Sequence, residues 1–301
     1  MDVELFLNQV FNGIGNGVGY AAVALAIVIV FRTTGLFNFA QGEMAMLSTF
    51  VTWQLSESMP IGLALVVGAA LSFVGGALVE RTLIRPMEAK GNPLGTVIIT
   101  IGLFISMNAL IQLIWPPSKA QSNPFSMPKP FPNRGTVEIF GAHLSWFTIW
   151  FVIILLIECA LLYLLLQKTK LGLSLRAVAS NQESSKLVGI DVGKMLMIGW
   201  GLAAAIGAVA GVLLASRTNQ FDVSMMQFIL AYAFAAAALG GFDSPLGAVV
   251  AGFIVGVAEA LAITYIDAVD GIPIVVPLLL IFFVLLFRPE GMFGRKVVER
   301  V

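Results

Sequence analysis

The sequence has little charge, one cysteine and one histidine, and each scarcity excludes a class of protein. Only 11% of its 301 residues are charged, whereas soluble domains carry about 25%. The lone Cys159 excludes an internal disulfide and a cysteine metal site. His143 lacks the spacing of a metal motif, so no metal site is predicted. The net charge of zero, without a basic or acidic tail, gives no indication of nucleic-acid binding.

The sequence also lacks the phosphate-binding loop GxxxxGK[ST], because Gly193-Lys194 is followed by Met195. The chain is therefore not expected to bind nucleotide phosphates in that manner by itself. No nucleophile–base set is apparent, so no catalytic residue is predicted and an enzyme is the least favoured class. The N-terminus lacks the basic region of a signal peptide, and its first apolar run is interpreted as a retained span.

Apolar residues, in contrast, make up 58% of the chain, with a mean hydropathy of +0.95. A helix needs about 20 mostly apolar residues to cross a bilayer. Nine segments approach that requirement, namely residues 9–31, 38–55, 61–80, 94–115, 145–166, 195–215, 226–241, 245–266 and 272–288. Two of these segments are short, so eight to ten spans are expected. The predicted fold is an all-α, polytopic transmembrane helical bundle of about nine spans.

The basic residues predict the orientation, since Lys and Arg concentrate on the cytoplasmic side of a membrane protein. Alternating connections place most of the 17 basic residues on the side that contains the polar segment 168–194. The opposite side receives Lys119, Lys129, Arg134 and Arg217. We therefore expect residues 168–194 to form a cytoplasmic loop and 116–144 an external loop, with the N-terminus outside and the C-terminus in the cytoplasm.

Polar residues inside the expected spans mark functional positions more often than surface ones do, because burying them in lipid is costly. The candidates for a translocation pathway are Asn38, Gln41, Glu43, Thr100 and Asn108. The first three fit a pathway and an interfacial helix cap equally well. For most polar side chains of the fourth span, at residues 94–115, hydrogen bonds that hold helices together are the favoured interpretation.

Single acids and small residues give weaker signals. Glu158 and Glu259 stand alone in apolar runs, and we expect them to be protonated or to hydrogen bond between helices. The pairs Gly207-x-x-x-Gly211 and Gly252-x-x-x-Gly256 allow two helix backbones to approach closely. Packing within one subunit is the favoured interpretation of both pairs, and a face between subunits is the alternative.

The polar segment 168–194, KTKLGLSLRAVASNQESSKLVGIDVGK, predicts a short helix at the inner membrane surface. Ser180 or Asn181 can cap a helix that begins at Gln182, and Gly189 can end it. Apolar and polar residues mix along this segment, which indicates either a docking surface for a partner or a helix resting on lipid headgroups.

Part of this segment resembles a known family. Residues 175–190, LRAVASNQESSKLVGI, are similar to the coupling loop of bacterial ABC importer permeases, which is written around an E-A-A-x-x-x-G core. Two serines stand where that core has alanines. The runs GLFNFAQGEMAML (35–47), TIGL (100–103), GGFDSPLGAVVAGFIVG (240–256) and LLFRPEGMFGR (285–295) resemble the LivH-type branched-chain amino acid permeases. That family commonly has His where this chain has Gln41.

The resemblance implies that residues 1–301 form one permease domain in the bacterial inner membrane. This domain would be half of a pathway for branched-chain amino acids or a related small polar solute. The implied partners are two cytoplasmic ATPase subunits carrying ATP and Mg, a second LivM-like or identical permease, a periplasmic substrate-binding protein and membrane lipid. The implied ATPase-coupling residues are Leu175, Arg176, Ala177, Glu183, Ser184, Ser185 and Gly189. A urea or amide permease of the same family and a stand-alone ion-coupled carrier or channel are the alternatives.

Overall fold

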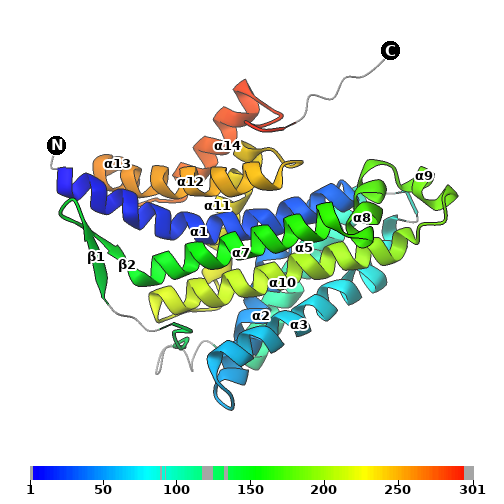
Figure 1. The fold of residues 1–301 in the computed structure, drawn as a ribbon, viewed down its shortest axis with the longest axis horizontal. Coiled ribbons are helices and arrows are strands. Elements are labelled where there is room, and N and C mark those ends of the chain that lie inside the picture. The colour runs from blue at the N-terminus through cyan, green and yellow to red at the C-terminus, as the bar shows by residue number, and fades with distance from the viewer. Residues whose placement is uncertain (1–2, 89, 92, 117–124, 132–134, 295–301) are drawn as a thin grey trace. The chain divides into compact units, whose positions relative to one another are not determined.

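The computed structural model describes residues 3–88, 90–91, 93–116, 125–131 and 135–294 (Figure 1). Five basic residues that entered the orientation count lie outside the described residues, namely Lys119, Arg134, Arg295, Lys296 and Arg300. Parts of the expected external loop at 116–144 lie outside them as well.

The described chain is mostly helical, and a helix occupies each of the nine segments predicted as spans. These helices are α1 (Val3–Thr34), α2 (Gln41–Ser56), α3 (Ile61–Val79), α5 (Pro93–Ile114), α7 (Trp146–Lys168), α10 (Val192–Thr218), α11 (Met225–Gly240), α12 (Pro245–Tyr265) and α14 (Val275–Phe287). Six helices in the described part are long and apolar enough to cross a membrane, while α11 and α14 are apolar but shorter. The all-α polytopic class is therefore confirmed, and the number of spans stays a prediction.

Several short elements were not predicted. The helix α3 continues through a π-helical turn, η1 (Glu80–Ile84), into α4 (Arg85–Glu88), and α13 (Asp267–Asp270) follows α12. Two strands, β1 (Thr136–Ile139) and β2 (Ala142–Ser145), form an antiparallel hairpin inside the expected external loop. Its turn places Phe140 at φ 53° and Gly141 at φ 83°, the paired positive φ values that tight hairpins require.

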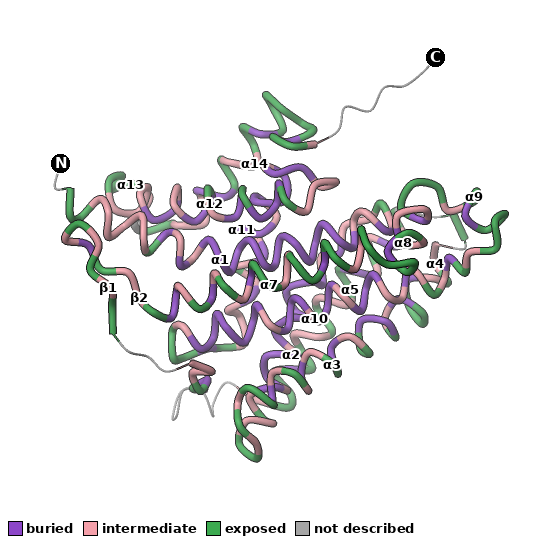
Figure 2. Tube along the Cα trace, viewed as in Figure 1, coloured by how far each residue is buried: buried purple, intermediate pink, exposed green. Residues whose placement is uncertain are grey.

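The chain divides into two compact units. Unit 1 comprises Met1–Val28, Asn133–Leu155 and Phe228–Val301, and unit 2 comprises Ile29–Pro132 and Leu156–Gln227. Figure 2 shows that buried residues run along α1, α2 and α10, whereas α3, α5 and α7 expose much of their surface. Exposed apolar faces on long helices are what a lipid environment stabilises.

In unit 1, α1 and α12 touch through glycines on both helices. A Cβ added at Gly13 would lie 2.6 Å from the Val257 Cα, and one added at Gly17 would lie 2.8 Å from the Phe253 Cα. The facing glycines on α12 are Gly252 and Gly256. This GxxxG pair therefore packs within the chain, which is the interpretation that the sequence favours.

In unit 2, α10 packs against α2 and α3. Its Gly207 faces the side chains of Gln41 and Ala45, and its Gly211 faces Thr49. This second GxxxG pair also packs within the chain, so both favoured interpretations are confirmed. On α3, a Cβ added at Gly76 would lie 2.7 Å from the Trp200 carbonyl oxygen, so α3 and α10 approach each other closely.

Candidate functional site

A buried carboxylate lies at the centre of the polar residues of unit 2. Glu43, in the first turn of α2, is fully buried. Its oxygens accept hydrogen bonds from the Gln227 amide at 3.0 Å and the Asn108 amide at 3.3 Å. Two amide donors from different helices satisfy a group that would be costly to bury alone.

The other candidate pathway residues, Asn38, Gln41 and Thr100, make hydrogen bonds of their own. Asn38 precedes α2, and its amide donates to the Gln41 side chain at 3.2 Å. Gln41 donates in turn to the Ala203 carbonyl of α10 at 3.0 Å, which fixes the start of α2 against α10. The Thr100 hydroxyl donates to the Val97 carbonyl of its own helix at 2.8 Å.

The structure therefore brings Glu43 and Asn108 together, pairs Asn38 with Gln41 and leaves Thr100 within α5. Sequence reasoning missed Gln227. Its one signal was a side-chain amide at the start of the apolar segment 226–241.

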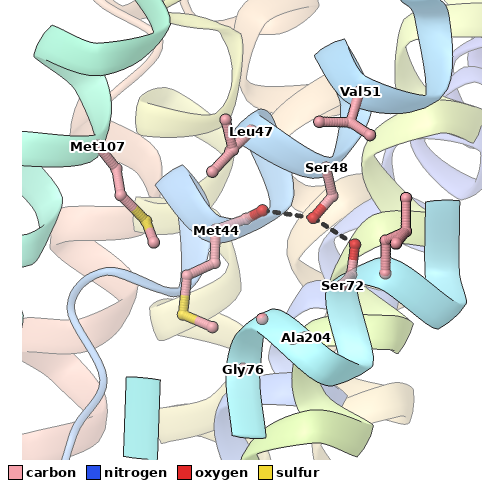
Figure 3. Close-up of a pocket in the computed structure, with 10 residues that line it drawn as sticks. Met44, Leu47, Ser48, Val51, Ser72, Gly76, Met107 and Ala204 are labelled. Atoms are coloured by element: carbon pink, nitrogen blue, oxygen red, sulfur yellow. Dashed lines mark hydrogen bonds between the residues drawn. The ribbon is translucent and has the colours of Figure 1, made fainter. Parts of the chain in front are cut away.

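An apolar cavity of about 120 Å³ lies between α2, α3, α5 and α10 (Figure 3). Met44, Leu47 and Val51 of α2 form one wall, Gly76 of α3 and Ala204 of α10 another, and Met107 of α5 closes the side. Figure 3 shows that the hydroxyls of two lining serines, Ser48 and Ser72, point toward each other. Ser48 donates to the Met44 carbonyl at 2.7 Å, and Ser72 donates to Ser48 at 2.6 Å.

These hydrogen bonds engage both hydroxyls, so the cavity offers mainly apolar surface to an occupant. The cavity shares α2 and α5 with the buried carboxylate. Met44 directly follows Glu43, and Met107 directly precedes Asn108.

Unit 1 holds a second buried carboxylate. Glu259 of α12 accepts hydrogen bonds from the Tyr20 hydroxyl at 2.6 Å and the Asn16 amide at 3.3 Å, both on α1. The Tyr20 ring stacks on Tyr232 with centroids 4.6 Å apart. The prediction that Glu259 hydrogen bonds between helices is confirmed, although its partners lie too far away in the sequence for spacing to find them. Glu158 is partly buried on α7.

The polar segment 168–194 folds into two helices, α8 (Lys170–Ser180) and α9 (Gln182–Leu187). The Asn181 side chain accepts a hydrogen bond from the Ser184 backbone at 2.8 Å, so Asn181, not Ser180, is the N-cap of the predicted helix. Gly189 follows at φ +81°, a conformation that favours glycine. The separate helix α8, capped by Thr169, was not predicted.

The seven candidate coupling residues differ in exposure. Leu175 and Ser185 are buried, Arg176 and Ala177 are half-buried, and Glu183, Ser184 and Gly189 are exposed. Ser185 donates to the Asn181 carbonyl at 2.8 Å. One of the two serines that replace alanines of the E-A-A pattern is therefore buried.

Two large apolar side chains project from the end of α9. Leu187 is 89% exposed and Val188 is 75% exposed. The base of the segment is held by Asp191, which accepts a hydrogen bond from the Lys194 backbone at 3.0 Å and caps α10. This backbone N–H lowers the pKa of the Asp191 carboxyl below its usual range.

Within the described part of the chain, no three His, Cys, Asp or Glu side chains are grouped to hold a metal ion. Long apolar helices, a buried polar cluster beside a cavity and an exposed polar segment with an apolar tip together define a polytopic membrane protein of the transport class.

The chain belongs to the family described as branched-chain amino acid transport system, permease component, whose model matches residues 9–287. It is 30% identical to the permease protein BraD of a high-affinity branched-chain amino acid transport system of Pseudomonas aeruginosa, over 100% of this chain and 99% of that one. It is also 30% identical to the corresponding LivH protein of Escherichia coli, over 98% of both chains. The chain is thus the permease subunit of an ABC importer, a multi-pass protein of the inner membrane.

Proposed function

We propose that this permease carries branched-chain amino acids, or a related small polar solute, inward across the membrane. Relatives that match over 98–99% of their length are permeases of branched-chain amino acid transport systems, which supports this substrate class. The chain itself would form half of the pathway and perform no chemistry, so two partner ATPases with bound ATP and Mg would supply the energy.

The pathway is proposed to pass the cluster of Glu43, Asn108 and Gln227. A carboxylate can accept the ammonium group of an amino acid, because opposite charges attract strongly where water is scarce. The neighbouring cavity of about 120 Å³ suits an aliphatic side chain. Its volume corresponds to roughly four water molecules.

The single observation that carries the coupling proposal is the exposed apolar tip formed by Leu187 and Val188. Apolar side chains with this exposure favour burial in a partner, and each is worth about 1.5–3 kcal/mol when fully buried. The cap at Asn181 and the turn at Gly189 hold α9 in one shape, which lowers the entropic cost of docking. The tip would enter a cleft on a cytoplasmic ATPase.

We infer the orientation from the basic residues and the other partners from the family. Arg85, Lys168, Lys170 and Lys194 gather at the end of unit 2 that carries α8 and α9, which supports a cytoplasmic position for that end. The N-terminus would then be outside and the C-terminus cytoplasmic. A second LivM-like or identical permease and a periplasmic substrate-binding protein would complete the transporter.

The test uses the full transporter in proteoliposomes, with ATPases, second permease and binding protein present. The double variant L187S/V188S is expected to lower leucine uptake about tenfold or more, because two apolar anchors lose their burial. The variant L173S is the control, since Leu173 is an apolar side chain that is also exposed but lies on α8 and not on α9.

Unchanged uptake by the tip variant would overturn the docking site. Competition by unlabelled urea, but not by valine, would assign the solute to the urea and amide permeases. Uptake by the purified chain alone, driven by an ion gradient, would favour a stand-alone carrier.

A further inference from the structure

An ion pair lies where α3 continues into η1 and α4, outside the sites described above, and its arginine also reaches the start of α10. Arg85 donates through Nε to Glu80 Oε1 at 3.1 Å and through Nη2 to Glu80 Oε2 at 2.7 Å. Glu80 is fully buried, whereas the Arg85 side chain is 36% exposed. A two-point contact of this kind fixes direction as well as distance, because the guanidinium fork matches the two carboxylate oxygens.

The same guanidinium reaches a segment that is distant in the sequence. Arg85 Nη2 also donates to the Gly193 carbonyl oxygen at 2.7 Å. Gly193 lies in the first turn of α10, two residues after the capping Asp191. A Cβ added at Gly193 would lie 2.7 Å from Arg85 Nη1 and 2.8 Å from Arg85 Cζ, so a side chain at this position would displace the guanidinium.

The π-helical turn η1 is what allows this contact. Residues five apart point in different directions in an α-helix, because its period is 3.6 residues. In η1 the Arg85 backbone N–H bonds to the Glu80 carbonyl, which widens the turn and brings both side chains to one side. A wide turn of this kind is rare and is often found at functional positions.

The hydrogen bond between Arg85 and Gly193 connects the segment that bears α8 and α9 with the helix α3. On one side, Gly193 is where the segment bearing α8 and α9 becomes the long helix α10. On the other side, η1 continues directly from α3, whose Ser72 and Gly76 line the cavity. The Arg85–Gly193 hydrogen bond is therefore a direct polar connection between the start of α10 and the helix that lines the cavity.

We propose that Arg85 is a positioning residue that transmits the movement of the polar segment 168–194, called here the coupling segment, to α3. This inference rests on the proposed ATP-driven function. Glu80 orients the Arg85 guanidinium, and the Gly193 carbonyl oxygen accepts a hydrogen bond from it. The Glu80–Arg85–Gly193 contact is thereby a rigid link between coupling segment and pathway.

The experiment measures leucine uptake and ATP hydrolysis together in the reconstituted full transporter. R85K keeps the positive charge and loses the fork, so uptake per ATP hydrolysed is expected to fall about tenfold while the ATPases stay bound. R81K is the matched control, since Arg81 is an exposed arginine of the same π-helical turn. Its ratio of uptake to hydrolysis is expected to equal that of the unaltered protein.

An unchanged ratio in R85K would overturn the proposal, even if the amount of protein in the membrane fell. If R85K does not fold, the double variant E80Q/R85Q is measured instead, because it removes both charges and leaves none buried without a partner. A low ratio in that variant supports the link, and a normal ratio overturns it. The proposed function fails separately, if the unaltered chain shows no ATP-dependent uptake or if the tip variant L187S/V188S transports normally.

Discussion

The two units each contain a close helix crossing built on a GxxxG pair, and they use it differently. In unit 1, glycines of α1 and α12 face each other, and backbone meets backbone at Gly13 and Val257. In unit 2, the glycines lie on α10 alone, and side chains of α2 occupy the space beside them. The nearest atom to a Cβ added at Gly207 is the Gln41 side-chain nitrogen, at 2.8 Å.

This difference separates a rigid helix crossing, α1–α12, from a more adaptable one, α2–α10. Backbone atoms cannot move aside without displacing a whole helix, so the α1–α12 crossing tolerates little change. Side chains can change rotamer, so α2 and α10 can shift relative to each other at lower cost. The cavity, the Glu43 cluster and the segment 168–194 all lie in unit 2, together with this crossing of α2 and α10.

The largest expected effect comes from filling the crossing of unit 1. G13V adds three carbons where the first already lies 2.6 Å from the Val257 Cα. We expect a loss of stability of about 3 kcal/mol or more, because overpacking against backbone finds no relief. The measurement is the unfolding midpoint of the purified permease in detergent. G102V is the control, since a Cβ at Gly102 meets nothing within 4 Å.

The next effect distinguishes the two buried carboxylates. E43Q keeps one acceptor oxygen and turns an NH₂ group toward the Asn108 and Gln227 donors, so leucine uptake is expected to fall about tenfold. E259Q keeps an acceptor for the Tyr20 hydroxyl, and uptake is expected to change less than about twofold. Equal losses of uptake in both variants would contradict the assignment of the pathway to unit 2.

The smallest effect is expected from G207A, which meets the far end of the flexible Gln41 side chain. We expect a loss of about 1 kcal/mol or less, because Gln41 can shift and alanine also favours the helix. Unfolding of G207A and G13A under identical conditions gives the comparison directly. If G207A destabilised the protein as much as G13A, the distinction between a rigid and an adaptable crossing would be lost.

Local features of the sequence predicted much of this protein. The nine apolar segments became helices because length and hydropathy are properties of each segment by itself. The helix that begins at Gln182 was also predicted, since a cap at Asn181 and a glycine at 189 act within a few residues. Boundaries were less accurate, as α2 begins at Gln41 and leaves Asn38 in the preceding connection.

The groups that form the candidate sites could not be found in this way. Gln227 joins Glu43 across 184 residues, and Tyr20 joins Glu259 across 239. The π-helical turn that brings Arg85 back to Glu80 has no motif in the sequence, and neither does the reach of Arg85 to Gly193.

The sequence by itself determined that the chain is a polytopic helical membrane protein and which segments form helices. These properties depend on composition, hydropathy and caps within a few residues. The tertiary structure alone decided which polar side chains satisfy each buried carboxylate, which glycines meet backbone, and how the coupling segment is tied to α3. The reason is physical: in a low-dielectric interior each polar group must find a partner, and only packing determines which helix supplies it.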